Sequence, residues 1–410
     1  MRNREGSQKP EARSQNGNTT NSASRSLTSR CLIRRIAILA SGSWLLASFL
    51  LPDLTVAHET LTTTVLFDRE IVRILNKHCV MCHVENGPSF PLSTYEQTWL
   101  QGRKVRAEVI ARHMPPWAAV PGYGQFANEN NLTLRETQFM VSWVEGLGPR
   151  NAGTVFLNVQ DSGAPRPRPV QAQADFGHWQ LGEPSLLREL PANTIEAQAA
   201  NDIKRTVIDL GLTAERRVRA LEYMPGDRRV VRAAFFTVQE TGQWIGSWTP
   251  WYGFSSLPEG AAYRLPAGSH VVAEIHYRGA KERVVERGRL GLFFADKPVP
   301  NTVSSLVLEG KSDSQKLRAE SRLAADAYAL ALRPEIGAGV KSVEVSARKP
   351  DGGTEILLFA KDIPVDWPTP YVFKAPVLLR RGTVLSVTAY SAQPGRIRLT
   401  VTTASSISNH

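Results

Sequence analysis

The 410-residue chain is poor in cysteine, with only three, and this scarcity excludes a structural disulfide framework. Cys31 lies in a basic N-terminal segment, whereas Cys79 and Cys82 stand three residues apart in the stretch "NKHCVMCHVENGPSF". An exported chain that relied on disulfides would carry further pairs of cysteines. Both thiols of the close pair are therefore available for another task.

Soft metal ligands are missing from the last third of the chain. Between Tyr277 and Asn409 there is no histidine, no cysteine and no methionine. Redox copper requires imidazole or sulfur donors, whereas carboxylates alone suit hard cations. This stretch therefore cannot hold a copper ion with its own side chains.

A concentrated basic surface is also missing, although the net charge is +11. Residues 1–57 hold eight Lys and Arg against three Asp and Glu, and the remaining positive charge is scattered. No basic helix and no basic stripe with interleaved aromatic residues is present. The pattern argues against a nucleic-acid partner.

Residues 1–57 are typical of a targeting leader. Arg34 and Arg35 precede an apolar run from Ile36 to Leu51, and "TVA" before His58 is suitable for cleavage. We expect a cleaved signal peptide, and the alternative is an uncleaved tether in the inner membrane. Both predict a periplasmic or otherwise extracytoplasmic protein.

The motif Cys79-Val-Met-Cys82-His83 predicts covalent attachment of one haem c. Cys79 and Cys82 lie about one helical turn apart, so both sulfurs reach the same edge of a haem, and His83 becomes the proximal iron ligand. A redox-active CxxC or half of a zinc site is the alternative. Each lacks its partner here, because no second cysteine pair and no thioredoxin-like pattern is present.

The sixth iron ligand is expected from the same domain. Met81 lies inside the attachment loop and Met140 falls on the apolar face of a helix, which leaves Met114 as our prediction, with His113 as the alternative. Met114 follows a helix and precedes two prolines that keep the backbone extended. Histidine–methionine ligation fills both axial positions, which favours electron transfer over oxygen chemistry.

The patterning predicts a multidomain fold of α plus all-β type. We expect a helical cytochrome c domain at 60–150, a Pro/Gly/polar linker at 151–174, and antiparallel β-sandwiches at 175–298 and 299–405. Asp68 is expected to be the N-cap of the first helix. Capping boxes are expected at Ser93 with Glu96 and at Thr133 with Glu136.

Several stretches resemble a known family. The run "MPPWAAVPGYGQFANENNLTLRETQFMVSWVEGLGPR" resembles the cytochrome c module that precedes bacterial copper type II, ascorbate-dependent monooxygenase-like proteins. "RALEYMPGDRRVV", "LPAGSHVVAEIHYRG" and "RLGLFFA" are similar to the sandwich that follows it. The distant relative is the eukaryotic peptidylglycine alpha-hydroxylating monooxygenase. The resemblance spans residues 65–392 and implies two jelly-roll sandwiches, each with a copper ion.

The copper ligands of that family are not matched in this chain. Arg232 and Ala233 stand where the resemblance places a His-His pair, and only His276 of "EIHYRG" remains. At the second site the run Pro334–Ile336 occupies the ligand positions. One imidazole does not hold copper, so we predict that both copper sites are lost.

A remaining metal alternative uses His270, Glu274 and His276. These residues share one face of a strand but span about 20 Å, so they need help from a second strand to converge.

The aromatic run "GQWIGSWTPWYGF" is expected to pack across a sandwich edge, with a docking patch as the alternative.

The favoured function is an exported electron-transfer protein with copper-free sandwiches as scaffold or partner-binding module. Its redox partner would be another protein, for which a copper-bearing homologue is one candidate. One alternative is a copper-dependent monooxygenase-like oxidoreductase with a built-in haem donor. The other is a structural subunit of an envelope redox complex. No catalytic residue is predicted.

Overall fold

The structure is a computed structural model that describes residues 63–152, 177–299, 301–312, 315–337, 339–364 and 366–406. The predicted leader, and the predicted linker apart from its first two residues, lie outside these ranges. The described residues belong to one compact unit. None of the helices in the described ranges combines the length and apolar character needed to cross a bilayer.

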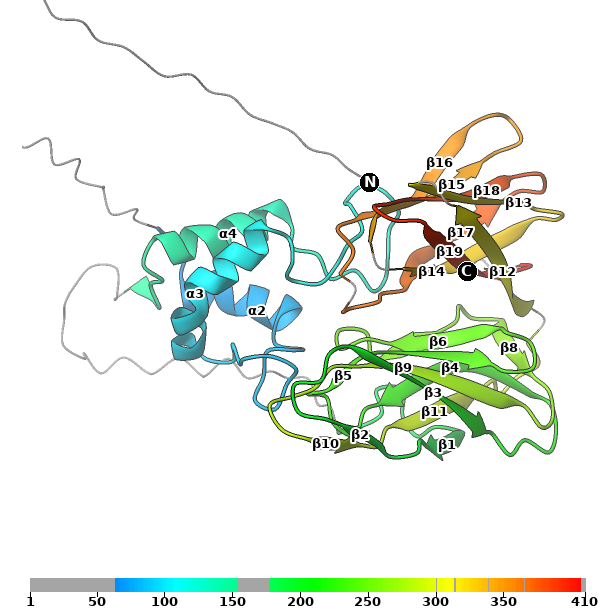
Figure 1. Cartoon of the computed structure of the whole chain (residues 1–410), viewed down its shortest axis with the longest axis horizontal. Coiled ribbons are helices and arrows are strands. Elements are labelled where there is room, and N and C mark those ends of the chain that lie inside the picture. Colours follow the sequence, from blue (N-terminus) through cyan, green and yellow to red (C-terminus); the bar gives the residue numbers. More distant parts are fainter. Residues whose placement is uncertain are drawn as a thin grey trace, which may run out of the picture. The chain divides into compact units, whose positions relative to one another are not determined.

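A group of short helices comes first along the chain (Figure 1). They are the π-helical turn η1 (Phe67–Ile71), α2 (Val72–His78), α3 (Tyr95–Ile110) and α4 (Leu134–Glu145). They enclose a small apolar core of their own, which includes the fully buried Leu75, Met140 and Trp143. Such short helices depend on this shared core, because isolated helices of this length are marginal in water.

Two of the three predicted helix starts are wrong in detail. The N-cap of the first helical turn is Leu66 rather than Asp68, and it has no side-chain hydrogen bond. The capping box of α3 uses Thr94 and Gln97, one residue beyond the predicted pair, because the Thr94 hydroxyl accepts from the Gln97 amide. The box at Thr133 and Glu136 is confirmed.

Strands make up 44% of the described residues and helices 13%, so the coarse prediction of a few helices with a large β region is confirmed. The strands up to residue 299 are β1 (Leu186–Glu189), β2 (Asn193–Ile195), β3 (Asp202–Asp209), β4 (Arg216–Met224), β5 (Val231–Val238), β6 (Trp244–Trp248), β7 (Phe254–Ser256), β8 (Ala261–Leu265), β9 (His270–Tyr277), β10 (Val284–Glu286) and β11 (Arg289–Phe294). The strands after residue 300 are β12 (Asn301–Ser312), β13 (Lys316–Arg322), β14 (Ala327–Ile336), β15 (Val340–Arg348), β16 (Thr354–Lys361), β17 (Tyr371–Leu379), β18 (Val384–Ser391) and β19 (Gly395–Ala404).

The strands form two layered halves, each with its own apolar core. In the first sandwich, the sheet β3-β9-β5-β6 and the strands β1-β11-β4-β8 contribute to one buried cluster. In the second sandwich, the sheet β13-β18-β15-β16 and the strands β12-β19-β14-β17 contribute to another. Alternating burial along β9 and β15 shows the period of two expected for strands with one buried face.

One sheet runs through both halves. β8 pairs with β12 in parallel through Ala261 with Asn301 and Ala262 with Thr302, whereas the other described strand pairs are antiparallel. The sequence pattern predicts antiparallel strands throughout, so this junction corrects that expectation. Local patterning cannot reveal it, because the paired residues lie 40 positions apart.

A non-helical segment, residues 117–128, links the helices to the second sandwich; we call it the connecting arm. Val120 donates its amide to the Phe359 carbonyl at 2.8 Å, and Ala127 donates to the Val372 carbonyl at 2.7 Å. Trp117 and Phe126 are buried in the core of the second sandwich. The chain directly after Met114 is therefore held by β16 and β17.

Candidate haem-attachment site

The cysteine motif lies at the end of α2. Cys79 is the C-cap residue of this helix, and the amides of Cys82 and His83 both donate to the Cys79 carbonyl, at 3.0 and 2.9 Å. The three residues therefore occupy a single tight turn. Both cysteines are half-buried, and they form no disulfide with each other.

The imidazole of His83 is held by a hydrogen bond to the backbone. Its Nδ1 lies 2.8 Å from the Phe90 carbonyl oxygen, which can only accept a hydrogen bond, so Nδ1 carries the proton. Burial lowers the pKa of His83, although the Phe90 hydrogen bond opposes this shift. The ring is therefore neutral at pH 7, and its Nε2 lone pair is available to a metal.

The two thiols are unlike those of a redox-active CxxC. Burial raises the pKa of Cys79 to about 12 and that of Cys82 to about 11. A redox CxxC needs the opposite shift, because the thiolate is the reactive species. At Cys82 the guanidinium groups of Arg228 and Arg232 partly offset the effect of burial on the pKa.

Met114 lies beyond the end of α3 and is half-buried. The preceding His113 is exposed and pairs with Glu108 at 3.1 Å, so a neighbouring carboxylate already engages this ring. Met140 is only 1% exposed within the helical core, which matches the packing role predicted for it. The assignment of Met114 as distal ligand stays a prediction.

Two arginines of the first sandwich contact the attachment loop. Arg228 donates from Nη2 to the carbonyl of Met81, between the two cysteines, at 3.3 Å. Arg232 donates more weakly from Nη2 to the carbonyl of Pro88 at 3.5 Å. The sequence indicates Arg232 only as a residue that replaces a copper ligand of the similar family, and it gives no indication that Arg228 contacts the attachment loop. Their positions beside the loop depend on contacts between residues about 145 positions apart.

The aromatic run 242–254 has a structural role. Trp244 and Trp248 are 3% and 2% exposed, and Trp248 belongs to the core of the first sandwich. Trp251 is half-buried and faces Trp367, with ring centroids 6.1 Å apart. The two central tryptophans are thus core residues, in line with the packing interpretation rather than an exposed patch.

The residues of the alternative metal site, His270, Glu274 and His276, form ion pairs and hydrogen bonds with other side chains. His276 contacts Glu274 at 3.0 Å, and Arg333 of the second sandwich bonds to the same carboxylate at 3.0 Å. His270 bonds instead to Glu240 at 2.8 Å, so the two histidines have different partners. Within the described ranges, no group of three or more His, Cys, Asp or Glu residues is arranged to hold a metal ion.

The ion pairs of Glu274 predict how the stability of the fold changes in acid. Burial alone raises the pKa of Glu274, but the His276 hydrogen bond and the charges of Arg333 and Arg205 outweigh it and hold the pKa at about 2, against an ordinary 4.5. The carboxylate therefore stabilises the fold above pH 4.5, and this contribution is lost as the pH falls from about 4.5 to about 2. Glu274→Gln should unfold more easily at neutral pH, and its deficit should shrink within that window.

Denaturant titrations at several pH values measure this convergence, with the exposed Glu309→Gln as a control. A deficit that stayed constant from pH 7 to pH 2 would contradict the ion-pair account.

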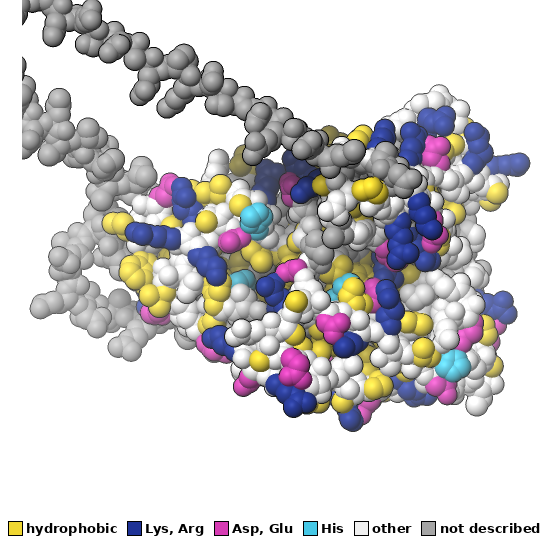
Figure 2. Space-filling model, in the orientation of Figure 1, with side chains coloured by type: hydrophobic (Ala, Val, Ile, Leu, Met, Phe, Trp, Pro, Cys, Tyr) yellow, Lys and Arg dark blue, Asp and Glu magenta, His cyan; other side chains and the backbone are white. Residues whose placement is uncertain are grey.

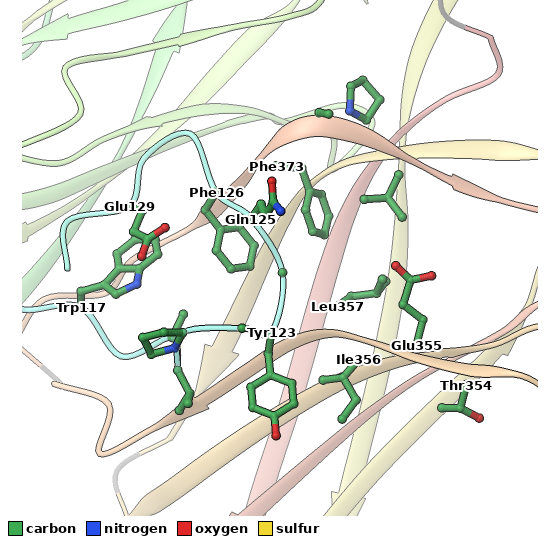
Figure 3. A pocket seen from close by; sticks show the side chains of 18 residues that line it. Trp117, Tyr123, Gln125, Phe126, Glu129, Thr354, Glu355, Ile356, Leu357 and Phe373 are labelled. Atoms are coloured by element: carbon green, nitrogen blue, oxygen red, sulfur yellow. The ribbon is translucent and has the colours of Figure 1, made fainter. Parts of the chain in front are cut away.

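A separate cavity of about 930 Å³ lies between the connecting arm and strands β16 and β17 (Figure 3). Its lining includes the stacked rings of Phe126 and Phe373, whose centroids lie 5.5 Å apart, and the carboxylates of Glu129 and Glu355. None of the four predicted haem-site residues lines it.

On the face drawn in Figure 2, basic and acidic side chains are interspersed rather than gathered by sign.

Comparisons with known proteins give little guidance. No protein-family model matches the chain, and no curated protein matches it. The major capsid protein P2 from bacteriophage PM2 is similar over 55% of this chain and 99% of its own, with 12% identity and a TM-score of 0.27. The PBSX exported protein XepA is similar over 53% and 86%, with 8% identity and a TM-score of 0.16. Likenesses this weak carry no argument about fold or function.

Proposed function

We propose that this chain is an exported c-type cytochrome that transfers electrons. Cys79 and Cys82 would hold one haem through thioether bonds, and His83 and Met114 would be its axial ligands. The observation that carries the proposal is the turn at the end of α2, where two unpaired thiols adjoin a neutral imidazole fixed by the Phe90 carbonyl. The donor set fits a haem c.

When bound, a haem supplies reversible one-electron chemistry. The residues of this chain would determine how that chemistry is used. His83 would hold the iron through Nε2 and Met114 through its thioether, and these two residues together would leave oxygen no place to bind. Phe90 keeps the imidazole in one tautomer and one orientation.

The sandwiches would act as a scaffold for both haem-binding loops. Arg228 holds the carbonyl between the two cysteines, and the connecting arm fixes the segment that follows Met114. This support is consistent with a partner-binding role toward a redox protein outside the cytoplasm, such as a copper-bearing homologue.

Copper chemistry is the second candidate function, favoured by the family resemblance and by the His276–Glu274 pair. Against it, the guanidinium of Arg232 lies at the first expected copper position, and Arg333 directly precedes the second. The Arg232 side chain is buried, and a buried fixed cation opposes the binding of another cation. Arg333 already pairs with Glu274 at 3.0 Å. We therefore propose a copper-free protein.

The test is attachment of haem to purified full-length chain, made in a host that matures c-type cytochromes. We expect one iron and no copper per chain, and haem that stays on the polypeptide in a denaturing gel. The double variant Cys79→Ser/Cys82→Ser should lose this covalent haem, whereas Cys31→Ser, the matched control, should keep it.

Stoichiometric copper would support the monooxygenase alternative. Wild-type chain without covalent haem would overturn the proposed function. Haem that cannot be reduced by any co-purifying partner would favour the structural-subunit alternative.

A further inference from the structure

We propose that Arg232, together with Arg228, joins the first sandwich to the haem-attachment loop and raises the haem reduction potential by fixing positive charge beside it. The proposal rests on the proposed haem function and concerns how the sandwich regulates it. Both residues would be positioning residues, because neither supplies an iron ligand or a thioether sulfur.

The first argument is geometric. The two arginines lie at the loop between β4 and β5 and at the start of β5, and both donate to backbone carbonyls of the attachment region. Arg228 reaches Met81, which lies between the thiols, and Arg232 reaches Pro88, five residues after His83. Two guanidinium groups from one sandwich thus contact the loop on either side of His83 along the sequence.

The second argument is that both side chains are held in place. Arg228 also donates to the Pro250 carbonyl at 3.2 Å, and its guanidinium lies 5.3 Å from the ring centre of Trp248. Arg232 donates to the Arg229 carbonyl at 3.0 Å and lies 4.8 Å from the ring centre of Trp367. Cation–π contacts with the buried Trp248 and the half-buried Trp367 hold the two guanidinium groups in place.

The third argument concerns charge. Arg232 is 6% exposed, and no carboxylate lies within ion-pairing distance of it among the described residues. Asp366, a carboxylate that raises the pKa of Arg232, pairs instead with Arg278. Burial lowers the pKa of both arginines to about 10, which still leaves them protonated at neutral pH.

The expected effect follows from Coulomb's law. Reduction of the iron removes one positive charge from the haem, so a nearby fixed cation favours the reduced form. Water screens a buried charge poorly, and salt does so less than at the surface. The arginine that stands at the lost copper position would therefore act on the haem through its field.

The experiment measures the midpoint potential of full-length haem-loaded protein by spectroelectrochemical titration, at low and high salt. Arg232→Gln should lower the potential, and the double variant with Arg228→Gln should lower it further. Arg232→Lys, which retains the charge, should restore most of the wild-type value. Arg264→Gln is the matched control, because this arginine of the same sandwich is exposed and paired with Glu215.

Haem content and the spectrum are recorded first, so a failure of attachment in the wild type tests the proposed function and not this inference. Unchanged potential in Arg232→Gln with haem in place would overturn the inference. Equal shifts in Arg232→Gln and Arg232→Lys would also overturn it, because they would indicate packing rather than charge. If Arg232→Gln does not fold, Arg228→Gln alone must lower the potential for the proposal to stand.

Discussion

Replacement of Met114 by alanine is expected to leave the haem attached, lower its reduction potential, and let the reduced iron bind carbon monoxide. The thioether favours the ferrous state, so its loss removes a stabilising ligand from the reduced form and opens one axial position. Attachment should persist, because Cys79 and Cys82 lie on a different segment of the chain. A potentiometric titration and a carbon monoxide difference spectrum measure both effects.

Met140→Leu is the matched control for this experiment. Met140 is 1% exposed within the helical core, and leucine conserves its volume and apolar character, so the potential and the carbon monoxide response should stay near those of the wild type. His113→Ala tests the alternative distal ligand. A Met114→Ala protein that excluded carbon monoxide, beside a His113→Ala protein that bound it, would show that the distal ligand is the histidine.

Trp117→Ala is expected to have the largest effect on stability. Trp117 is 7% exposed, and its ring lies 5.2 Å from that of Tyr371 and 5.9 Å from that of Phe126 in the second core. Truncation of a buried tryptophan costs about 3–5 kcal/mol through lost burial and the cavity left behind. A denaturant titration should show that loss in the free energy of unfolding.

The same variant should also loosen the iron–sulfur bond, because Trp117 anchors the chain three residues beyond Met114. The charge-transfer absorption of that bond should weaken in the oxidised protein at temperatures where the fold is intact. Trp99→Ala is the control, since Trp99 is 53% exposed on α3 and should lose far less stability. A destabilised Trp117→Ala protein with unchanged iron–sulfur absorption would show that the arm supports the sandwich but not the distal ligand.

Some features of the fold follow from short-range pattern. The capping box at Thr133 needs only residues three apart, and α4 ends at Gly146 as the sequence indicates. The predicted capping box of α3 was one residue too early, because Ser93 and Glu96 show the same spacing as Thr94 and Gln97, which form the box. The spacing indicates that a capping box is present, and the backbone geometry decides which pair of residues forms it.

In the candidate site, too, some features could be predicted from the sequence and others could not. Cys79, Cys82 and His83 are neighbours in sequence, so their turn could be expected from the motif. The Phe90 carbonyl that fixes His83 carries no signal of its own, because every residue has such a group. Arg232 carries a weak signal, because it is an arginine within the otherwise apolar strand β5, whereas Arg228 lies in the polar loop before that strand and carries none. Only the fold shows what the two residues face.

The sequence by itself determined the attachment motif, the scarcity of sulfur and imidazole donors after Tyr277, and the succession of helices followed by strands. These depend on composition and on hydrogen bonds or periodicities within a few residues. The tertiary structure alone decided the parallel junction of β8 with β12, the anchoring of the arm on β16 and β17, and the two arginines at the attachment loop. These contacts join residues that lie 40 to about 240 positions apart in the sequence. Burial and backbone hydrogen bonds between such distant residues stabilise the protein only when the whole chain is packed.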